Sequence, residues 1–170
     1  MADQNHQLSP DVLSALDRYA DMVKRVCTLY LRRREDVEDV FQDVFLKYMQ
    51  RTEPFEQAEH EKAWIIRVTI NRCKDFVGSF WQRRIVPLDP ERMSVTPVEG
   101  GGLLEAVLKL PEKERTMIYL FYYEGYAATE IAEITGQKVN TVYSHLHRAR
   151  ARLRQDLGGI DDEKSNPAGL

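Results

Sequence analysis

Five cations and no acid lie between residues 138 and 154, in a strongly basic segment of the chain: Lys138, Arg148, Arg150, Arg152 and Arg154. Lysine and arginine bind phosphate, and the planar guanidinium of arginine also matches the edge of a guanine base. Ordinary solvated helices mix both charge signs, which this segment does not. The segment therefore predicts contact with a nucleic acid, with a solvated basic helix as the alternative.

The same segment has a helical period. Apolar residues recur at three- and four-residue steps, at Val139, Val142, Leu146, Ala149, Leu153 and Leu157. The opposite side presents polar and basic residues: Thr141, Ser144, His145, Arg148 and Arg152, with Tyr143 at the edge and Lys138 at the start. A helix that is apolar on one side and basic on the other suits a DNA major groove flanked by phosphates.

A second, shorter helix is expected just before it. Ile131, Ala132 and Ile134 give an apolar face within residues 128–134, and Gly136 follows in a sequence that breaks the pattern. Glycine supplies the positive φ that a sharp turn between helices needs. Residues 126–154 therefore predict a helix-turn-helix whose second helix lies in the groove.

A second basic stretch spans residues 62–84, with six Lys or Arg against the single acid Asp75. Residues 62–81 are predicted to form a helix whose apolar residues cover most of its circumference. They leave a narrow polar strip of Arg67, Asn71, Lys74 and Asp75. Because such a helix must be largely buried, we expect its functional contacts to come from this exposed strip.

Carboxylates gather on another predicted helix, residues 35–49. Asp39, Gln42, Asp43 and Leu46 share an exposed stripe opposite the apolar one. A carboxylate-metal enzyme is one alternative, using Asp36, Asp39, Asp43, Glu56, Glu59 and His60. Metal sites in helical bundles need acids that face inward, and these face away from the apolar stripe. No metal and no cofactor are therefore predicted.

These segments imply an all-α architecture of two small helical domains. The first spans residues 11–84 and contains helices over 11–34, 35–49 and 62–81, with an acidic loop at 52–61 that holds Phe55. Prolines and Gly100-Gly101-Gly102 mark residues 85–102 as a flexible linker. The second domain spans 103–157, and residues 158–170 form a tail predicted to be disordered.

Composition narrows the possible functions further. The net charge is −3, with acidic segments between the two basic ones, so binding to any polyanion without discrimination is not expected. No apolar run approaches the ~20 residues of a membrane span, and residues 1–30 lack the features of a signal peptide, so we expect a cytoplasmic location and no membrane insertion. Cys27 and Cys73 lack metal-ligand spacing and are predicted to be buried thiols.

Taken together, these residues resemble the extracytoplasmic-function (ECF) sigma factors of bacterial RNA polymerase, the smallest members of the sigma-70 family. The resemblance covers about residues 16–157 and includes three motifs in order. DVEDVFQDVFLKYM resembles the core-binding helix, and KAWIIRVTINRCKDF resembles the helix for the downstream, minus-ten promoter element. Residues 110–154 resemble the reader of the upstream, minus-thirty-five element. A helix-turn-helix alone is common, whereas this combination is far more specific.

The resemblance assigns roles by position. Asp39, Gln42, Asp43 and Leu46 match the surface that docks on the clamp helices of the largest polymerase subunit. Asn71, beside Arg67 and Lys74, matches a reader of the minus-ten element. The loop around Phe55 matches a segment that captures a flipped base, although Phe55 packing back on its own domain is the alternative. Upstream DNA contacts are implied for Lys138, Thr141, Tyr143, Ser144, His145, Arg148 and Arg152.

The sequence departs from the family at the second helix of the helix-turn-helix. Lys138 stands where a capping Ser is usual, so the helix lacks a good side-chain acceptor at its first residue. Tyr143 and His145 stand where basic residues are typical, while Arg148 is retained. These departures leave the promoter sequence open but not the mode of binding.

The resemblance implies a transcription initiation factor that is not itself an enzyme. Its expected partners are RNA polymerase core, promoter DNA and an anti-sigma factor. A stand-alone helix-turn-helix regulator, which binds duplex DNA without polymerase, is the alternative.

Overall fold

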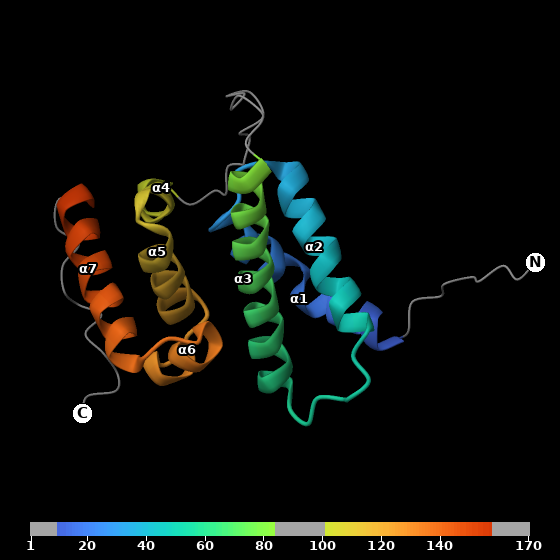
Figure 1. Ribbon diagram of the computed structural model, residues 1–170. Coiled ribbons are helices and arrows are strands. Elements are labelled where there is room, and N and C mark those ends of the chain that lie inside the picture. The colour runs from blue at the N-terminus through green and yellow to red at the C-terminus, as the bar shows by residue number, and fades with distance from the viewer. Residues whose placement is uncertain (1–9, 84–100, 158–170) are drawn as a thin grey trace, which may run out of the picture. The chain divides into compact units, whose positions relative to one another are not determined.

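Helices make up the regular structure of the computed structural model, which describes residues 10–83 and 101–157 (Figure 1). No strand occurs within those ranges, which confirms the all-α prediction. The contacts divide the described residues into two compact units, the first built mainly from residues 10–83 and the second mainly from residues 101–157. No helix in the described part is long and apolar enough to cross a membrane.

The first unit is a bundle of α1 (Pro10–Thr28), α2 (Arg34–Met49) and α3 (Ala58–Arg83), each packed against the other two. Its fully buried side chains come from all of these helices and include Val23, Val26, Val40, Val44, Ile65, Ile66 and Ile70. Burying an aliphatic side chain of this size contributes about 1.5–3 kcal/mol. Both cysteines are buried here, as predicted.

The apolar period of α1 predicts a buried stripe of Leu13, Leu16, Ala20, Val23, Cys27 and Tyr30, which the structure follows only in part. Val23 and Cys27 are buried, but Leu13 at the start of the stripe is 50% exposed, whereas Val12 and Ala15 are buried. Apolar residues occur in adjacent pairs along α1, so two stripes fit the helical period equally well. Packing against α2 and α3 decides between them.

The helix α3 begins at Ala58, four residues before the expected start at Lys62. Glu59 and Glu61 lie in its first turn, where carboxylates interact favourably with the positive end of the helix dipole. This earlier start shortens the loop between α2 and α3 and brings Glu61 into the helix.

The second unit contains α4 (Gly101–Lys109), α5 (Glu112–Ile118), the π-helical turn η2 (Tyr119–Tyr123), most of α6 (Ala128–Thr135) and α7 (Val139–Leu157). Glu133–Gly136, at the end of α6, is grouped with the first unit. α7 packs on α4 and α5. The core includes Met117, Leu120, Ile131, Val142 and Leu146, each at most 1% exposed. Gly136 has φ +67° between α6 and α7, the left-handed conformation predicted for this turn.

The predicted linker and tail fall largely outside the described residues. Residues 85–100 of the linker and all residues of the tail, 158–170, are not among the described residues. Gly101 and Gly102, which were assigned to the linker, begin α4 instead. Pro111 is the N-cap of α5. The boundaries of the domains otherwise remain a prediction.

Candidate nucleic-acid and protein interfaces

The polar face of α7 is solvent-accessible along its length. Lys138, Thr141, Ser144, Arg148 and Arg152 are exposed. Tyr143 is 54% exposed at the edge of this face, and His145 is half-buried. Val142, Leu146 and Ala149 on the opposite side are buried, so the face inferred from the helical period is the one that α7 presents.

The first backbone hydrogen bonds of α7 begin at Lys138. The carbonyl oxygen of Lys138 accepts hydrogen bonds from the amides of Thr141 and Val142, at 2.9 and 3.1 Å. The Ser144 hydroxyl donates to the carbonyl oxygen of Asn140 at 2.9 Å, within the helix. Lys138 thus directly precedes the first residue of α7, Val139, as predicted from the sequence.

Two of the predicted DNA-contacting arginines share a carboxylate from another helix. Arg148 Nε lies 3.6 Å from Glu114 Oε1, and Arg152 Nε lies 3.0 Å from Glu114 Oε2. Glu114 belongs to α5 and is only 4% exposed, whereas both arginine side chains are about half exposed. This contact could not be predicted from the sequence, where Glu114 is one of several charged residues in LPEKER.

The surroundings of His145 favour its neutral form. Burial lowers its pKa below the ordinary value, and the nearby cations Arg148 and Lys113 lower it further, against a smaller opposing effect of Glu114. Its Nδ1 lies 3.1 Å from Arg148 Nη2 and accepts a hydrogen bond when unprotonated. His145 therefore does not replace the cation that is typical at this position.

Arg150 belongs to a different face of α7 from Arg148. Its Nε donates to the Tyr122 hydroxyl at 2.7 Å, and its guanidinium lies over the rings of Phe121 and Tyr122, 5.5 and 5.6 Å from their centroids. Arg150 thus joins α7 to η2. The five cations of residues 138–154 therefore do not act as one surface.

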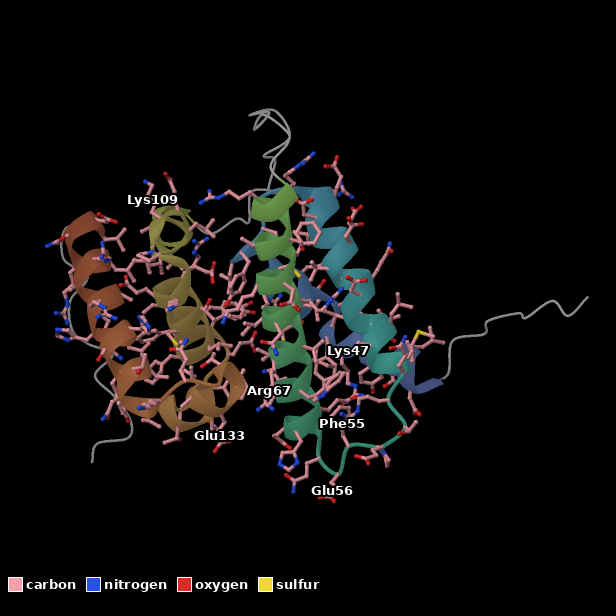
Figure 2. All side chains as sticks on the ribbon, viewed as in Figure 1. Lys47, Phe55, Glu56, Arg67, Lys109 and Glu133 are labelled. Carbon is pink, nitrogen blue, oxygen red and sulfur yellow. The ribbon has the colours of Figure 1, made fainter. Side chains whose placement is uncertain are left out.

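The polar strip of α3 is exposed as predicted. Arg67, Asn71, Lys74 and Asp75 are all accessible, while Ile66, Ile70 and Cys73 on the same helix are buried. Figure 2 labels Arg67 on this helix. The strip combines two cations with one amide, which suits contact with phosphates and base edges.

Phe55 lies within an aromatic cluster of the first unit (Figure 2). Its ring centroid is 5.6 Å from that of Trp64 and 6.1 Å from that of Tyr48. The Arg51 guanidinium lies over the Phe55 ring at 3.8 Å and over Trp64 at 4.8 Å. Phe55 thus packs on its own domain in the protein without DNA, and its capture of a flipped base stays a prediction.

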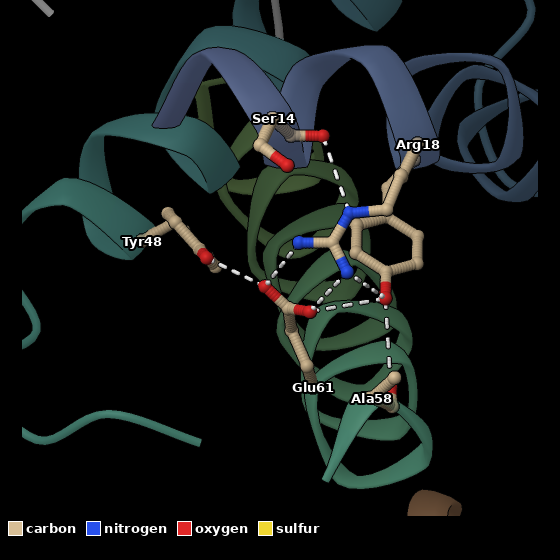
Figure 3. A network of polar contacts seen from close by, with 6 residues as sticks. Ser14, Arg18, Tyr48, Ala58 and Glu61 are labelled. Carbon is tan, nitrogen blue, oxygen red and sulfur yellow. Dashed lines mark hydrogen bonds and ion pairs between the residues drawn. The ribbon is translucent and has the colours of Figure 1, made fainter. Parts of the chain in front are cut away.

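A buried carboxylate holds the end of the same loop (Figure 3). Glu61, 5% exposed, accepts hydrogen bonds from Tyr48 at 2.6 Å and from Tyr19 at 3.1 Å. Arg18 Nη1 forms an ion pair with Glu61 Oε2 at 2.9 Å. This network ties α1, α2 and α3 together beside an open pocket lined by loop residues 51–58 and the start of α1. It was missed in the sequence, where Glu61 is one acid among several.

The acidic stripe of α2 is exposed only in part. Asp39 and Gln42 are accessible, and Leu46 is 52% exposed. Asp43 is half-buried and forms an ion pair with Arg72 of α3. Asp39, Gln42 and Leu46 therefore present a surface with an acid, an amide and an apolar side chain. The Asp43 carboxylate beside them is paired with Arg72.

In the described part of the chain, no three His, Cys, Asp or Glu residues are grouped so that they could hold a metal ion.

Comparisons with known proteins match two successive parts of the chain to regions of one family. The family described as Sigma-70 region 2 matches residues 15–83, and Sigma-70, region 4 matches residues 101–153. The RNA polymerase sigma-E factor of Streptomyces coelicolor is 30% identical over 135 residues, covering 74% of each chain. RNA polymerase sigma factor SigV of Bacillus subtilis is 29% identical over 139 residues, covering 78% of this chain and 82% of the relative.

Solved structures show the same fold. The sigma factor RpoE from Bartonella quintana, in complex with the anti-sigma factor NepR, has a TM-score of 0.66 at 21% identity and covers 89% of this chain and 99% of that one. CnrH, in complex with the cytosolic domain of CnrY, has a TM-score of 0.58 at 20% identity and covers 88% and 89%.

Proposed function

The chain belongs to the ECF group of the sigma-70 family of RNA polymerase sigma factors, and from this membership we propose the contacts that each of its surfaces makes. It is a transcription initiation factor that joins polymerase core and directs it to promoters. The observation that carries this function is the order of two matched regions, region 2 at residues 15–83 and region 4 at residues 101–153. The polymerase supplies the chemistry, in the cytoplasm.

The exposed part of α2 is the surface for polymerase core. Asp39, Gln42 and Leu46 are accessible, and acids on an exposed helix face favour a basic protein surface over DNA. Asp43 supports this surface while paired with Arg72. The largest-subunit clamp helices are the proposed partner. An anti-sigma factor is a further proposed partner, as in the complexes of the similar sigma factors.

Promoter DNA is contacted by both units. In the first unit Asn71 reads the minus-ten element, and Arg67 and Lys74 contact phosphates, since all of them are exposed on one strip. Phe55 acts there by holding the loop through its contacts with Trp64 and Arg51. In the second unit the exposed face of α7 lies in the minus-thirty-five major groove. Arg148 reads a base, and Lys138 and Arg152 contact phosphates.

Transcription of a genomic library tests the function as a whole. Core polymerase with the full-length chain should start transcripts at a defined set of promoters, and core alone should not. Sequence-specific binding to a palindromic duplex without polymerase, together with no change in transcript starts, would instead identify a stand-alone regulator.

A charge reversal tests the core-binding surface. Asp39→Lys places a cation against a basic partner, so its affinity for core should fall by about tenfold or more. Asp21→Lys, at an exposed position on α1, makes the same change in net charge and serves as the matched control. Equal affinity of both variants for core would contradict the assignment.

A further inference from the structure

Glu114 is a buried carboxylate with two cations from α7. It lies on α5, its side chain is 6% exposed, and its two oxygens lie 3.6 and 3.0 Å from Nε of Arg148 and Arg152. A carboxylate this buried is stable only when it is paired, so at least one arginine must remain close to it. Glu114 therefore limits how far the two guanidinium groups can move away from it at the same time.

The pairing restricts these groups without using all of their donors. Glu114 Oε2 has no aligned hydrogen bond among the described residues, so its contact with Arg152 is a charge contact. Arg148 is restrained a second time, because its Nη2 lies 3.1 Å from Nδ1 of His145. The side chains of Arg148 and Arg152 remain 53% and 55% exposed. Their remaining N–H groups are thus available to an acceptor outside the protein.

One carboxylate shared by two arginines also sets the charge of the DNA-facing side of α7. A helix with freely moving cations binds the phosphates of any duplex, because phosphate contacts carry no sequence information. A guanidinium held in one orientation favours a bidentate contact with a single base edge. Glu114 both removes one unit of positive charge from this surface and orients Arg148.

We propose that Glu114 is a positioning residue that determines the specificity of upstream promoter recognition. Its carboxylate holds Arg148 in the orientation that reads a base, and it prevents Arg148 and Arg152 from both binding phosphates indiscriminately. This inference rests on the proposed function, in which α7 lies in the major groove.

The test uses full-length protein with polymerase core and a promoter pool that is randomised in the upstream element only. In Glu114→Gln the side chain keeps its size and loses its charge. Enrichment of the preferred upstream sequence over the pool average should fall by about tenfold, as expected when one oriented base contact is lost. The variant alone should bind random duplex more tightly than the parent does. The slope of the logarithm of its binding constant against the logarithm of the salt concentration should become steeper by about one.

Glu112→Gln is the matched control, since it makes the same change in net charge in the first turn of the same helix. It should keep the parental enrichment. Equal loss of enrichment in both variants would attribute the effect to net charge and overturn the proposal. So would unchanged enrichment in Glu114→Gln, or equal weakening on preferred and random duplexes. A parent complex that selects no upstream sequence would instead refute the proposed function.

A second variant applies if Glu114→Gln does not fold. Arg152→Gln alters a half-exposed side chain and leaves the whole charge of Glu114 to Arg148. It should change the preference at the base pair that Arg148 reads. Weakening of all upstream sequences alike, with the preference retained, would show that Arg152 is only a phosphate contact and would overturn the coupling.

Discussion

At the scale of single residues, buried polar groups follow two patterns. Thr69 and Thr116 are buried and donate to carbonyl oxygens four residues earlier in their own helices, at 2.8 and 2.9 Å. Glu61 and Glu114 are buried as well, but their partners come from other helices. In the described residues, each unit thus has a buried carboxylate whose burial depends on tertiary contacts.

Replacing Glu61 should destabilise the first unit. Glu61→Ala removes the acceptor of Tyr19 and Tyr48 and the ion partner of Arg18. Because Arg18 is 45% exposed and can return to water, we expect a loss of about 2–3 kcal/mol rather than the larger cost of stranding a buried charge. Urea denaturation measures it. Glu59→Ala, at an exposed position of the same turn, should change the free energy of unfolding by less than ~0.5 kcal/mol.

The same network predicts a late-titrating tyrosine. Burial and the hydrogen bond to Glu61 raise the pKa of Tyr48 from 10.0 to about 12. Because the folded pKa is above the unfolded one, the neutral phenol stabilises the fold below pH 10, and this contribution is lost as the pH rises toward 12. Absorbance titration of tyrosinate should show a transition near pH 12 that disappears in Tyr48→Phe. A parental titration in which Tyr48 ionises with the exposed tyrosines would contradict this.

At the scale of elements, the loop between α2 and α3 is held at both sides. Phe55 and Arg51 cover Trp64, and Glu61 fixes the first turn of α3. The exposed strip of α3, from Arg67 to Asp75, lies on the same helix about two to four turns after Glu61. Packing of the loop and exposure of the strip are therefore separable properties.

This separation predicts opposite behaviour for two substitutions. Phe55→Ala removes ring contacts worth about 0.5–1.5 kcal/mol each, so amide exchange of residues 50–57 should become faster. Asn71→Ala should leave exchange unchanged and lower selection of the minus-ten element in the polymerase complex. Unchanged exchange in Phe55→Ala would mean that the cluster does not hold the loop, and reduced stability in Asn71→Ala would place Asn71 in the packing instead.

At the scale of the whole molecule, each unit has its own core. The first is closed by α1, α2 and α3, and the second by α7 on α4 and α5. The largest buried side chains, such as Ile65 and Leu146, belong to different units. Each core can therefore respond to substitution without the other.

Independent cores predict two unfolding transitions. Leu146→Ala, at a position 1% exposed, should destabilise the second unit by about 2–5 kcal/mol and leave the first transition unchanged. Glu61→Ala should instead destabilise the first unit and leave the transition of the second unit unchanged. Calorimetry with both variants measures the two transitions. A single transition that moves in either variant would show that the units unfold together.

The sequence by itself determined what depends on local period and turn chemistry. The apolar stripe of α7, the positive φ of Gly136 and the exposed strip around Asn71 agree with the structure. Each is decided within about two helical turns, because three- and four-residue spacing defines a face and only glycine readily adopts the left-handed turn. The order of the motifs then indicated the family.

Where the sequence allows two buried stripes or several charge partners, only the packing of the helices decides between them. Adjacent apolar pairs in α1 allow two stripes, and only packing against α2 and α3 buries Val12 rather than Leu13. Asp43 meets Arg72 across 29 residues, and Arg18 meets Glu61 across 43. Helical period fixes the face on which a charge lies, but not the residue opposite it. The partner of a buried charge such as Glu114 is set by how helices pack, which no local pattern contains.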